Sequence, residues 1–249
     1  MESSGSHSIK KKILVTFDVD GTLIQSTGPA SNRLHRRAFS HAFLDVFGIK
    51  DATIDVIQHH GQTDPGVIVN TLVHYGIPSE VATEKLPDLK ARMVEYAKEH
   101  AQDIGEGLQV LLGVASLLHV LSSKEDVAIG LVTGNLEEIA WLKMEGLCIR
   151  KYFTVPNFGG FGSDHIDRGH LVMIAADRAE KLFPGGFNLR VHVGDTPNDI
   201  RAAEFGGALA VGVCTGIFNK EELEQASNGN AVILEDLVDT NAFMNLLGI

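Results

Sequence analysis

The chain has 249 residues, of which 44% are hydrophobic and 21% charged, and its formal net charge is -11. This composition is typical of an ordinary soluble globular protein and argues against a disordered, fibrous or disulfide-stapled one. The negative charge would repel a nucleic-acid backbone, and the only basic run is Lys10 to Lys12. We therefore expect a folded enzyme or binding domain without a nucleic-acid partner.

We expect neither a secretion signal nor a membrane-spanning segment in this sequence. Residues 1–12 are rich in Ser and Gly and then basic, unlike a signal peptide. The longest apolar window, Val110 to Leu121, is interrupted by polar residues and is shorter than the ~20 residues that span a bilayer. Cys148 and Cys214 lie far apart without a metal or redox spacing, which predicts buried, reduced thiols. We expect a cytoplasmic protein with no membrane partner.

Short runs of β-branched and aliphatic residues that end in Gly, Asp or Thr recur along the chain and predict buried parallel strands. Segments with helical periodicity alternate with them, as in βα units. The predicted fold class is therefore α/β, with a doubly wound parallel sheet. The predicted strands are residues 13–17, 127–132, 189–193, 208–213 and 231–234, and the predicted helices among them are 136–147, 169–182, 198–205 and 236–247.

More than a hundred residues without a convincing buried strand separate the first strand from the second, which indicates an insertion. Residues 32–47, 65–75 and 78–100 have helical spacing, punctuated by glycines. We predict a helical cap domain over residues 26–104 and an α/β core over residues 1–25 and 105–249. The chain is expected to re-enter the core at Gly105 with a helix that runs through Leu121.

Two carboxylates follow the first predicted strand, at the sheet edge where ligands of open α/β sheets bind. Asp18 and Asp20 are two residues apart and begin on a common face. A carboxylate can attack phosphorus to give an aspartyl-phosphate, and a second can protonate the leaving oxygen and later activate water. We assign attack to Asp18 and proton transfer to Asp20. The alternative is a simple turn, since Asp-Gly pairs are common in turns.

Two further strand ends carry polar groups. Thr133, Gly134 and Asn135 offer a hydroxyl and backbone N–H groups at a helix start, which suit a phosphate oxygen. Asp195 and Asp199 lie four positions apart at the start of another helix, where they could bind Mg²⁺, although Asp and Thr also cap helices. Four carboxylates at two strand ends would repel one another without a cation. The candidate metal site consists of Asp18, Asp20, Asp195 and Asp199. The candidate phosphate site consists of Gly21, Thr22, Thr133, Gly134 and Asn135.

Together these residues resemble the motifs of the haloacid dehalogenase superfamily. The match is to its phosphatase branch, which includes proteins similar to phosphoglycolate phosphatase and β-phosphoglucomutase and carries a helical cap after the first motif. The first motif corresponds to Asp18 through Leu23, the second to Thr133, and the fourth to Gly194-Asp195 with Asp199. The resemblance spans nearly the whole chain and implies the same fold that the strand pattern predicts.

The third motif of that family is a Lys or Arg that neutralises the nucleophile and the phosphate. We choose Arg168, at the entry to a helix between the second and fourth motifs, because its surroundings resemble family members that use Arg. Lys143 and Lys181 compete for this role. Both fall within helical segments, where we interpret them as solvated surface lysines.

The loop of Gln62, Thr63 and Asp64 in the insert resembles the loop that reaches substrate in related caps. The alternative is a plain helix start, with Thr63 or Asp64 as the cap and Pro65 in the first turn. The neighbouring His59 and His60 are interpreted as a polar loop rather than a metal site.

The resemblance implies a magnesium-dependent phosphatase that hydrolyses a small phosphorylated metabolite through a phospho-aspartyl intermediate on Asp18. Asp20, Thr133 and Arg168 complete the catalytic set. A sugar-phosphate mutase of the same superfamily shares these residues and stays open. A non-catalytic phosphate-binding regulatory protein should have lost part of the set, and a carbon–halogen dehalogenase would need neither Asp20 nor the metal pair. The substrate, and whether the protein is a monomer or homodimer, are left open.

Overall fold

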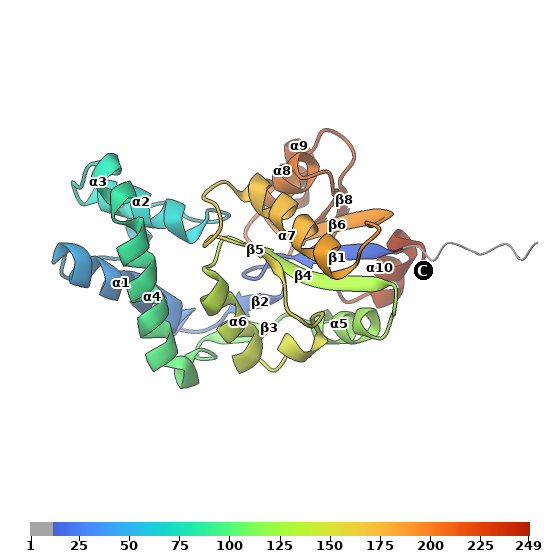
Figure 1. Cartoon of the computed structure of the whole chain (residues 1–249), viewed down its shortest axis with the longest axis horizontal. Coiled ribbons are helices and arrows are strands. Elements are labelled where there is room, and N and C mark those ends of the chain that lie inside the picture. The colour runs from blue at the N-terminus through green and yellow to red at the C-terminus, as the bar shows by residue number, and fades with distance from the viewer. Residues whose placement is uncertain (1–11) are drawn as a thin grey trace, which may run out of the picture.

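The computed structural model describes residues 12–249. Residues 1–11, which include Lys10, Lys11 and the start of the predicted core segment 1–25, lie outside the described residues. The centre is a six-stranded sheet of order β5-β4-β1-β6-β7-β8 (Figure 1), and every strand pair in it is parallel. The strands are β1 Ile13–Phe17, β4 Val127–Thr133, β5 Gly159–Phe161, β6 Leu189–Gly194, β7 Leu209–Val213 and β8 Val232–Leu234.

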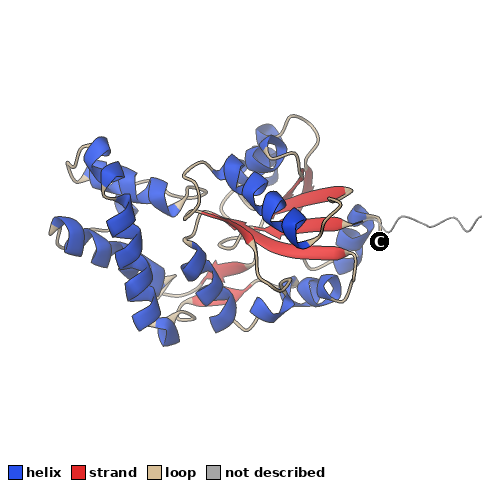
Figure 2. Ribbon diagram, in the orientation of Figure 1, coloured by secondary structure: helices blue, strands red, loops and turns tan. Residues whose placement is uncertain are grey.

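Helices cover both faces of this sheet, which confirms the predicted doubly wound α/β fold (Figure 2). On one face, α5, α6 and α10 pack against Ile13 and Val15. On the other face, α7, α8 and α9 pack against Leu14, Val132 and Ala210. Because β1 and β4 are buried along their whole length, apolar residues predominate in their sequences, with a single threonine in each. These helices are α5 Val114–Ser122, α6 Glu137–Gly146, α7 Arg168–Leu182, α8 Pro197–Phe205, α9 Lys220–Ala226 and α10 Thr240–Leu247.

Four helices between the first two strands of the sheet form the insertion and lie together at one end of the molecule (Figure 1). They are α1 Arg33–Phe47, α2 Asp64–His74, α3 Ser79–Glu84 and α4 Leu86–Glu99. They share an apolar cluster of their own, to which Leu136, the N-cap of α6, and Ile139 of α6 also belong. The division into a core and a cap at residues 26–104 stays a prediction, and this packing supports it.

A two-stranded antiparallel ribbon lies where the chain leaves the core and returns to it. β2 Ile24–Ser26 pairs with β3 Leu108–Val110, so that Ile24 lies opposite Val110. The helix expected from Gly105 through Leu121 was therefore wrong in its first part, and α5 begins only at Val114. Strands of three residues are too short to show a period of two in the sequence.

The single helix expected over residues 78–100 is two helices, α3 and α4, which meet at Lys85. Pro87 lies in the first turn of α4, where its missing N–H costs nothing and its ring prevents continuation from the preceding helix. β5, Gly159–Phe161, was not predicted, since two of its three residues are glycine.

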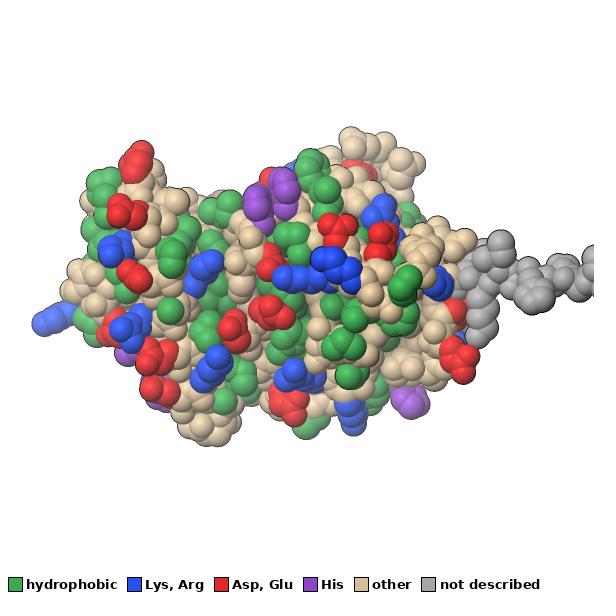
Figure 3. Space-filling view, in the orientation of Figure 1, with side chains coloured by type: hydrophobic (Ala, Val, Ile, Leu, Met, Phe, Trp, Pro, Cys, Tyr) green, Lys and Arg blue, Asp and Glu red, His purple; other side chains and the backbone are tan. Residues whose placement is uncertain are grey.

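The expectation of two buried thiols was wrong. Cys148, which follows α6 and has a φ of +60°, is exposed, and Cys214 is partly exposed. Both thiols are free. Among residues 12–249, no helix has the length and apolar character required to cross a bilayer. On the face seen in Figure 3, Lys and Arg side chains are interspersed with Asp and Glu.

Candidate active site

Three buried carboxylates lie together at the ends of two neighbouring strands. Asp18 follows β1, Asp195 follows β6, and Asp199 lies in the first turn of α8. Because Phe17 of β1 lies opposite Val193 of β6, the residues that follow them reach the same sheet edge. Carboxylate oxygens of the three residues lie within 4.8 Å of one another, and their exposed fractions are 4%, 4% and 1%. We call these three residues the carboxylate triad.

The start of α8 fixes the third member of the triad. Thr196 is the N-cap, Pro197 occupies the first turn, and the Asp199 carboxylate accepts hydrogen bonds from the backbone N–H of Thr196 at 3.0 Å and from its hydroxyl at 2.6 Å. Two strands of the sheet also contribute contacts. His192 Nε2 of β6 lies 3.3 Å from Asp199 Oδ1, and His192 Nδ1 lies 3.2 Å from the hydroxyl of Thr16 on β1. Asp199 therefore serves as both a capping residue and a member of the triad.

Arg168 is the cation that touches the triad. It is the first residue of α7, and its Nη2 lies 2.5 Å from Asp18 Oδ1 and 2.7 Å from Asp199 Oδ1. The side chain is 8% exposed, and its Nε has no hydrogen-bond partner among the described residues. An unpaired buried donor on a guanidinium is costly unless a ligand accepts from it, and phosphate oxygens suit its planar geometry.

The triad holds more negative charge than Arg168 compensates. Burial raises the pKa of Asp18 to about 6 despite the opposing charge of Arg168, and Asp199 adds to the rise. Burial, Asp18 and Asp199 raise the pKa of Asp195 well above its usual range. Burial also acts to raise the pKa of Asp199, but Arg168 and the hydrogen bonds from His192 and Thr196 lower it to about 2. A hard divalent cation would relieve this repulsion, and three carboxylates are a suitable donor set.

The fourth predicted carboxylate lies apart from the triad. Both oxygens of Asp20 accept from Lys143 Nζ, at 2.9 and 2.7 Å, and Asn135 Nδ2 donates to Oδ2 at 2.9 Å. Burial acts to raise the pKa of Asp20, but the charge of Lys143 outweighs it and lowers the pKa. The Asp20 side chain is 35% exposed, so it remains accessible beside the buried triad.

The interpretation of Lys143 as a solvated lysine was wrong. Its side chain is 0% exposed and lies on the inner side of α6. Helical spacing alone did not indicate which side of α6 faces the strand ends. Lys181, the other competitor for the third motif, is exposed near the end of α7, as expected of a surface lysine.

The predicted phosphate-binding residues divide into two groups. Thr133, fully buried at the end of β4, accepts from the backbone N–H of Asn135 at 3.3 Å and from its amide at 3.0 Å, which leaves its own hydroxyl hydrogen available. Thr22 instead donates to Asp195 Oδ1 at 3.2 Å. Gly21 has a φ of +93°, and a Cβ there would collide with the Asp195 carboxylate, so this position requires glycine.

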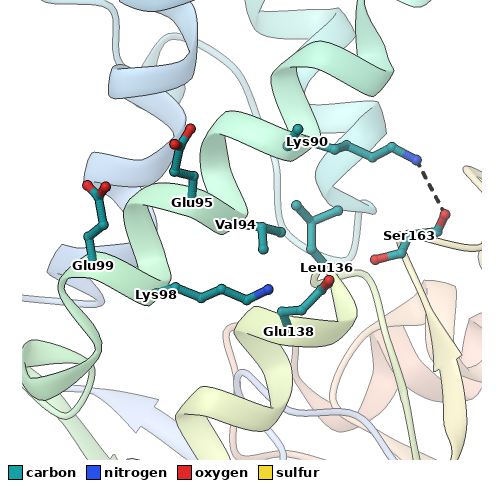
Figure 4. Close-up of a pocket in the computed structure, with 9 residues that line it drawn as sticks. Lys90, Val94, Glu95, Lys98, Glu99, Leu136, Glu138 and Ser163 are labelled. Atoms are coloured by element: carbon teal, nitrogen blue, oxygen red, sulfur yellow. Dashed lines mark hydrogen bonds between the residues drawn. The ribbon is translucent and has the colours of Figure 1, made fainter.

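One cavity of about 430 Å³ brings most of these residues together. Asp18, Asp20, Thr133, Gly134, Asn135, Arg168 and Asp195 all line it, whereas Gly21, Thr22 and Asp199 do not. We call it the catalytic cavity. A second cavity, of about 660 Å³, lies between α4 and the start of α6, where Lys90 Nζ donates to the Ser163 carbonyl at 3.3 Å (Figure 4). None of the predicted site residues lines this second cavity.

The predicted specificity loop lies where the insertion contacts the core. Thr63 is the N-cap of α2 and donates to the Ile166 carbonyl at 2.9 Å. Asp64 pairs with His35 at 2.9 Å and accepts from the backbone N–H of Leu136 at 2.8 Å. Gln62 and Asp64 line the catalytic cavity, but Thr63 does not. The capping geometry is therefore present at Thr63, while its two neighbours face the cavity.

Sequence reasoning missed the part of the cavity wall that α1 supplies. Asn32, His35, Arg36 and Phe39 line the cavity. Their spacing of three and four is that of one helix face, which was the available signal. His59 and His60 also line the cavity, with ring centroids 4.7 Å apart. The lining of the cavity therefore also includes imidazole, guanidinium, amide and aromatic groups.

Comparisons with known proteins agree with this geometry. The model of the haloacid dehalogenase-like hydrolase family matches residues 14–207, and a second model, described as HAD-hydrolase-like, matches residues 176–240. A comparison with curated proteins finds no match.

Solved structures with the same fold include three that span nearly the whole chain. A predicted phosphatase from Clostridium acetobutylicum is 17% identical, with a TM-score of 0.64 and coverage of 96% of this chain and 99% of that one. A predicted phosphoglycolate phosphatase from Haemophilus somnus is 18% identical, with a TM-score of 0.62 and coverage of 95% and 99%. A putative β-phosphoglucomutase from Thermotoga maritima is 20% identical, with a TM-score of 0.56 and coverage of 95% and 99%. At these identities the likeness establishes the fold.

Proposed function

The chain belongs to the haloacid dehalogenase-like hydrolase family, and from this premise we propose that it is a magnesium-dependent phosphatase acting on a small phosphorylated metabolite. The observation that carries the proposal is the contact of Arg168 with Asp18 inside a buried carboxylate triad, with a guanidinium N–H left unpaired. A nucleophile, a fixed cation and a free donor at one point suit a phosphoryl group.

In the first step Asp18 attacks phosphorus. A carboxylate oxygen of Asp18 forms a new P–O bond, the ester P–O bond breaks, and the leaving oxygen keeps the electron pair. Asp20 enters this step protonated, gives its proton to that oxygen and becomes the carboxylate that the charge of Lys143 favours. Arg168 and the Thr133 hydroxyl donate to the phosphoryl oxygens, whose charge they stabilise.

In the second step the aspartyl-phosphate is hydrolysed. The Asp20 carboxylate takes a proton from water while the water oxygen attacks phosphorus. The bond between phosphorus and the Asp18 oxygen breaks, which releases inorganic phosphate and restores Asp18 as a carboxylate. Asp20 is protonated again, so both residues return to their starting states.

Asp18, Asp195 and Asp199 would hold Mg²⁺, and the ion would supply positive charge against the phosphoryl oxygens. The raised pKa values of Asp18 and Asp195 support this assignment, because they reflect uncompensated negative charge. In the structure the Asp20 carboxylate pairs with Lys143 instead, which leaves it to proton transfer.

The test is a phosphate-release screen over a panel of phosphorylated metabolites with Mg²⁺ present. We expect release from at least one small phosphate ester, no release after Asp18→Asn, and no turnover in EDTA until Mg²⁺ is restored. Absence of release across the panel, or substantial activity of the folded Asp18→Asn variant, would refute the proposal. Isomerised sugar phosphate in the product mixture would identify a mutase instead.

A further inference from the structure

Lys143 is a buried cation that the proposed reaction does not yet use. Its side chain is 0% exposed, and its ammonium donates to Asp20 Oδ1 at 2.9 Å, Asp20 Oδ2 at 2.7 Å and Asn135 Oδ1 at 2.8 Å. An ammonium group has three hydrogens, so these three bonds use its whole donor capacity. It therefore has no donor left for a phosphate oxygen while this arrangement holds.

Stability of the fold alone gives little reason for an ion pair between Lys143 and Asp20. Burying an ammonium is costly, and a buried ion pair is often no more stable than apolar side chains of similar volume. Lys143 lies on α6 beside Ala140 and Met144, which belong to the apolar cluster of the core. Uncharged residues at both positions could fill the same space, so the charged pair points to a role in the reaction.

The contacts of Lys143 set the direction of the Asp20 carboxylate. Lys143 donates to both oxygens, and the Asn135 amide donates to Oδ2 at 2.9 Å. Asn135 is itself held by Lys143 and Thr133. Asn32 of the insertion adds a weaker contact to Oδ1 at 3.5 Å. Asp20 is thereby kept apart from the carboxylate triad while it lines the catalytic cavity.

We propose that Lys143 is a positioning residue, which aims the Asp20 carboxyl group at the leaving-group oxygen, and is not a second phosphate-binding cation. The proposal rests on the proposed phosphatase activity. Proton transfer to the leaving oxygen requires hydrogen-bond reach, so a displaced Asp20 cannot protonate it. The loss falls on substrates whose leaving oxygen must be protonated, such as alkyl phosphates. Aryl phosphates with stable phenolate leaving groups are spared.

The experiment compares kcat/KM for the preferred alkyl phosphate and for p-nitrophenyl phosphate in wild type, Lys143→Met and the exposed control Lys181→Met. We expect Lys143→Met to lower the alkyl value at least tenfold more than the aryl value, with Lys181→Met within twofold of wild type on both. In an Asp20→Asn background, Lys143→Met should cost less than a further twofold on the alkyl substrate, because it acts only through Asp20. Should Lys143→Met not fold, Lys143→Gln allows the same comparisons.

An equal loss on both substrates in a folded variant would overturn the proposal. So would a loss that persists undiminished in the Asp20→Asn background, since a phosphate-binding cation behaves in this way. These results differ from a failure of the proposed function, in which the wild-type protein releases no phosphate from any ester and the role of Lys143 falls with it.

Discussion

Without metal, the protein should become less stable as the pH rises from about 4 to about 6.5, and Asp18→Asn should remove the part of this loss that Asp18 contributes. Burial raises the pKa of Asp18 from 3.8 to about 6, so the folded state holds a proton that the unfolded chain releases. The contribution of a raised carboxyl pKa is fully present below pH 3.8 and is lost as the pH rises through 6.

The size of the effect follows from the shift in pKa. Roughly two pKa units correspond to about 3 kcal/mol of unfolding free energy. Asp195, whose pKa is also raised, changes stability in the same direction. Asp199 has a pKa lowered to about 2, so its stabilising contribution is lost only as the pH falls below 3.8, outside the window of interest.

The assay is urea unfolding followed by circular dichroism at a series of pH values in EDTA, for wild type and Asp18→Asn. Titrating groups outside the triad contribute to both curves, so the difference between the curves reports on the triad. Mg²⁺ at a hundred times its dissociation constant should stabilise the wild type by about 2.7 kcal/mol at pH 7. It should have little effect at pH 4, where protons compete for the carboxylates.

Parallel stability curves of the two proteins between pH 4 and 6.5 would refute the reasoning. They would mean that burial and neighbouring charge do not raise the pKa of Asp18. A gain in stability from Mg²⁺ at pH 4 as large as at pH 7 would likewise contradict a site built from titrating carboxylates.

Three further perturbations test other parts of the site. In phosphate-release kinetics, Arg168→Ala should lower kcat/KM by roughly 10²-fold or more, whereas Lys181→Ala should leave it unchanged. Equal effects of the two substitutions would contradict the assignment of Arg168 as the third-motif cation. Gln62→Ala should raise KM or reorder preference across a phosphate-ester panel but spare a minimal aryl phosphate, and an unchanged profile would assign the loop to capping alone. His192→Leu should weaken Mg²⁺ binding by roughly tenfold in calorimetry, because Asp199 loses a hydrogen bond, and His192→Gln should recover part of the lost affinity. Equal Mg²⁺ affinities of the wild type and His192→Leu would contradict this role of His192.

Most of the correct sequence-based predictions depend on where residues lie at the ends of parallel strands. Long buried strands are visible as apolar runs, and the residues that follow parallel strands must meet at one edge. Asp18, Thr133 and Asp195 could therefore be predicted to lie together before any side-chain position was known. The short strands β2, β3 and β5 could not be predicted, since three residues carry too little periodicity to distinguish a strand from a turn.

The surroundings of the helices were predicted less completely than the strand ends, because a helical pattern does not indicate what each face of the helix contacts. Lys143 has the spacing of a surface lysine, yet the side of α6 that carries it faces Asp20. The wall formed by α1 was missed for the same reason, although His35, Arg36 and Phe39 share one face. Which helix face meets the cavity depends on how the insertion packs on the core, and this packing is a property of the assembled fold.

α6 links that packing to the chemistry. Leu136 and Ile139 at its start belong to the apolar cluster of the insertion, whereas Trp141 and Met144 belong to that of the core. Lys143 lies on the same helix and holds Asp20. A helix anchored in two clusters cannot shift without disturbing both, because packed side chains leave few voids. The placement of Asp20, the proposed proton-transfer group, therefore depends on the contact between the insertion and the core, although Asp20 itself follows a strand of the core.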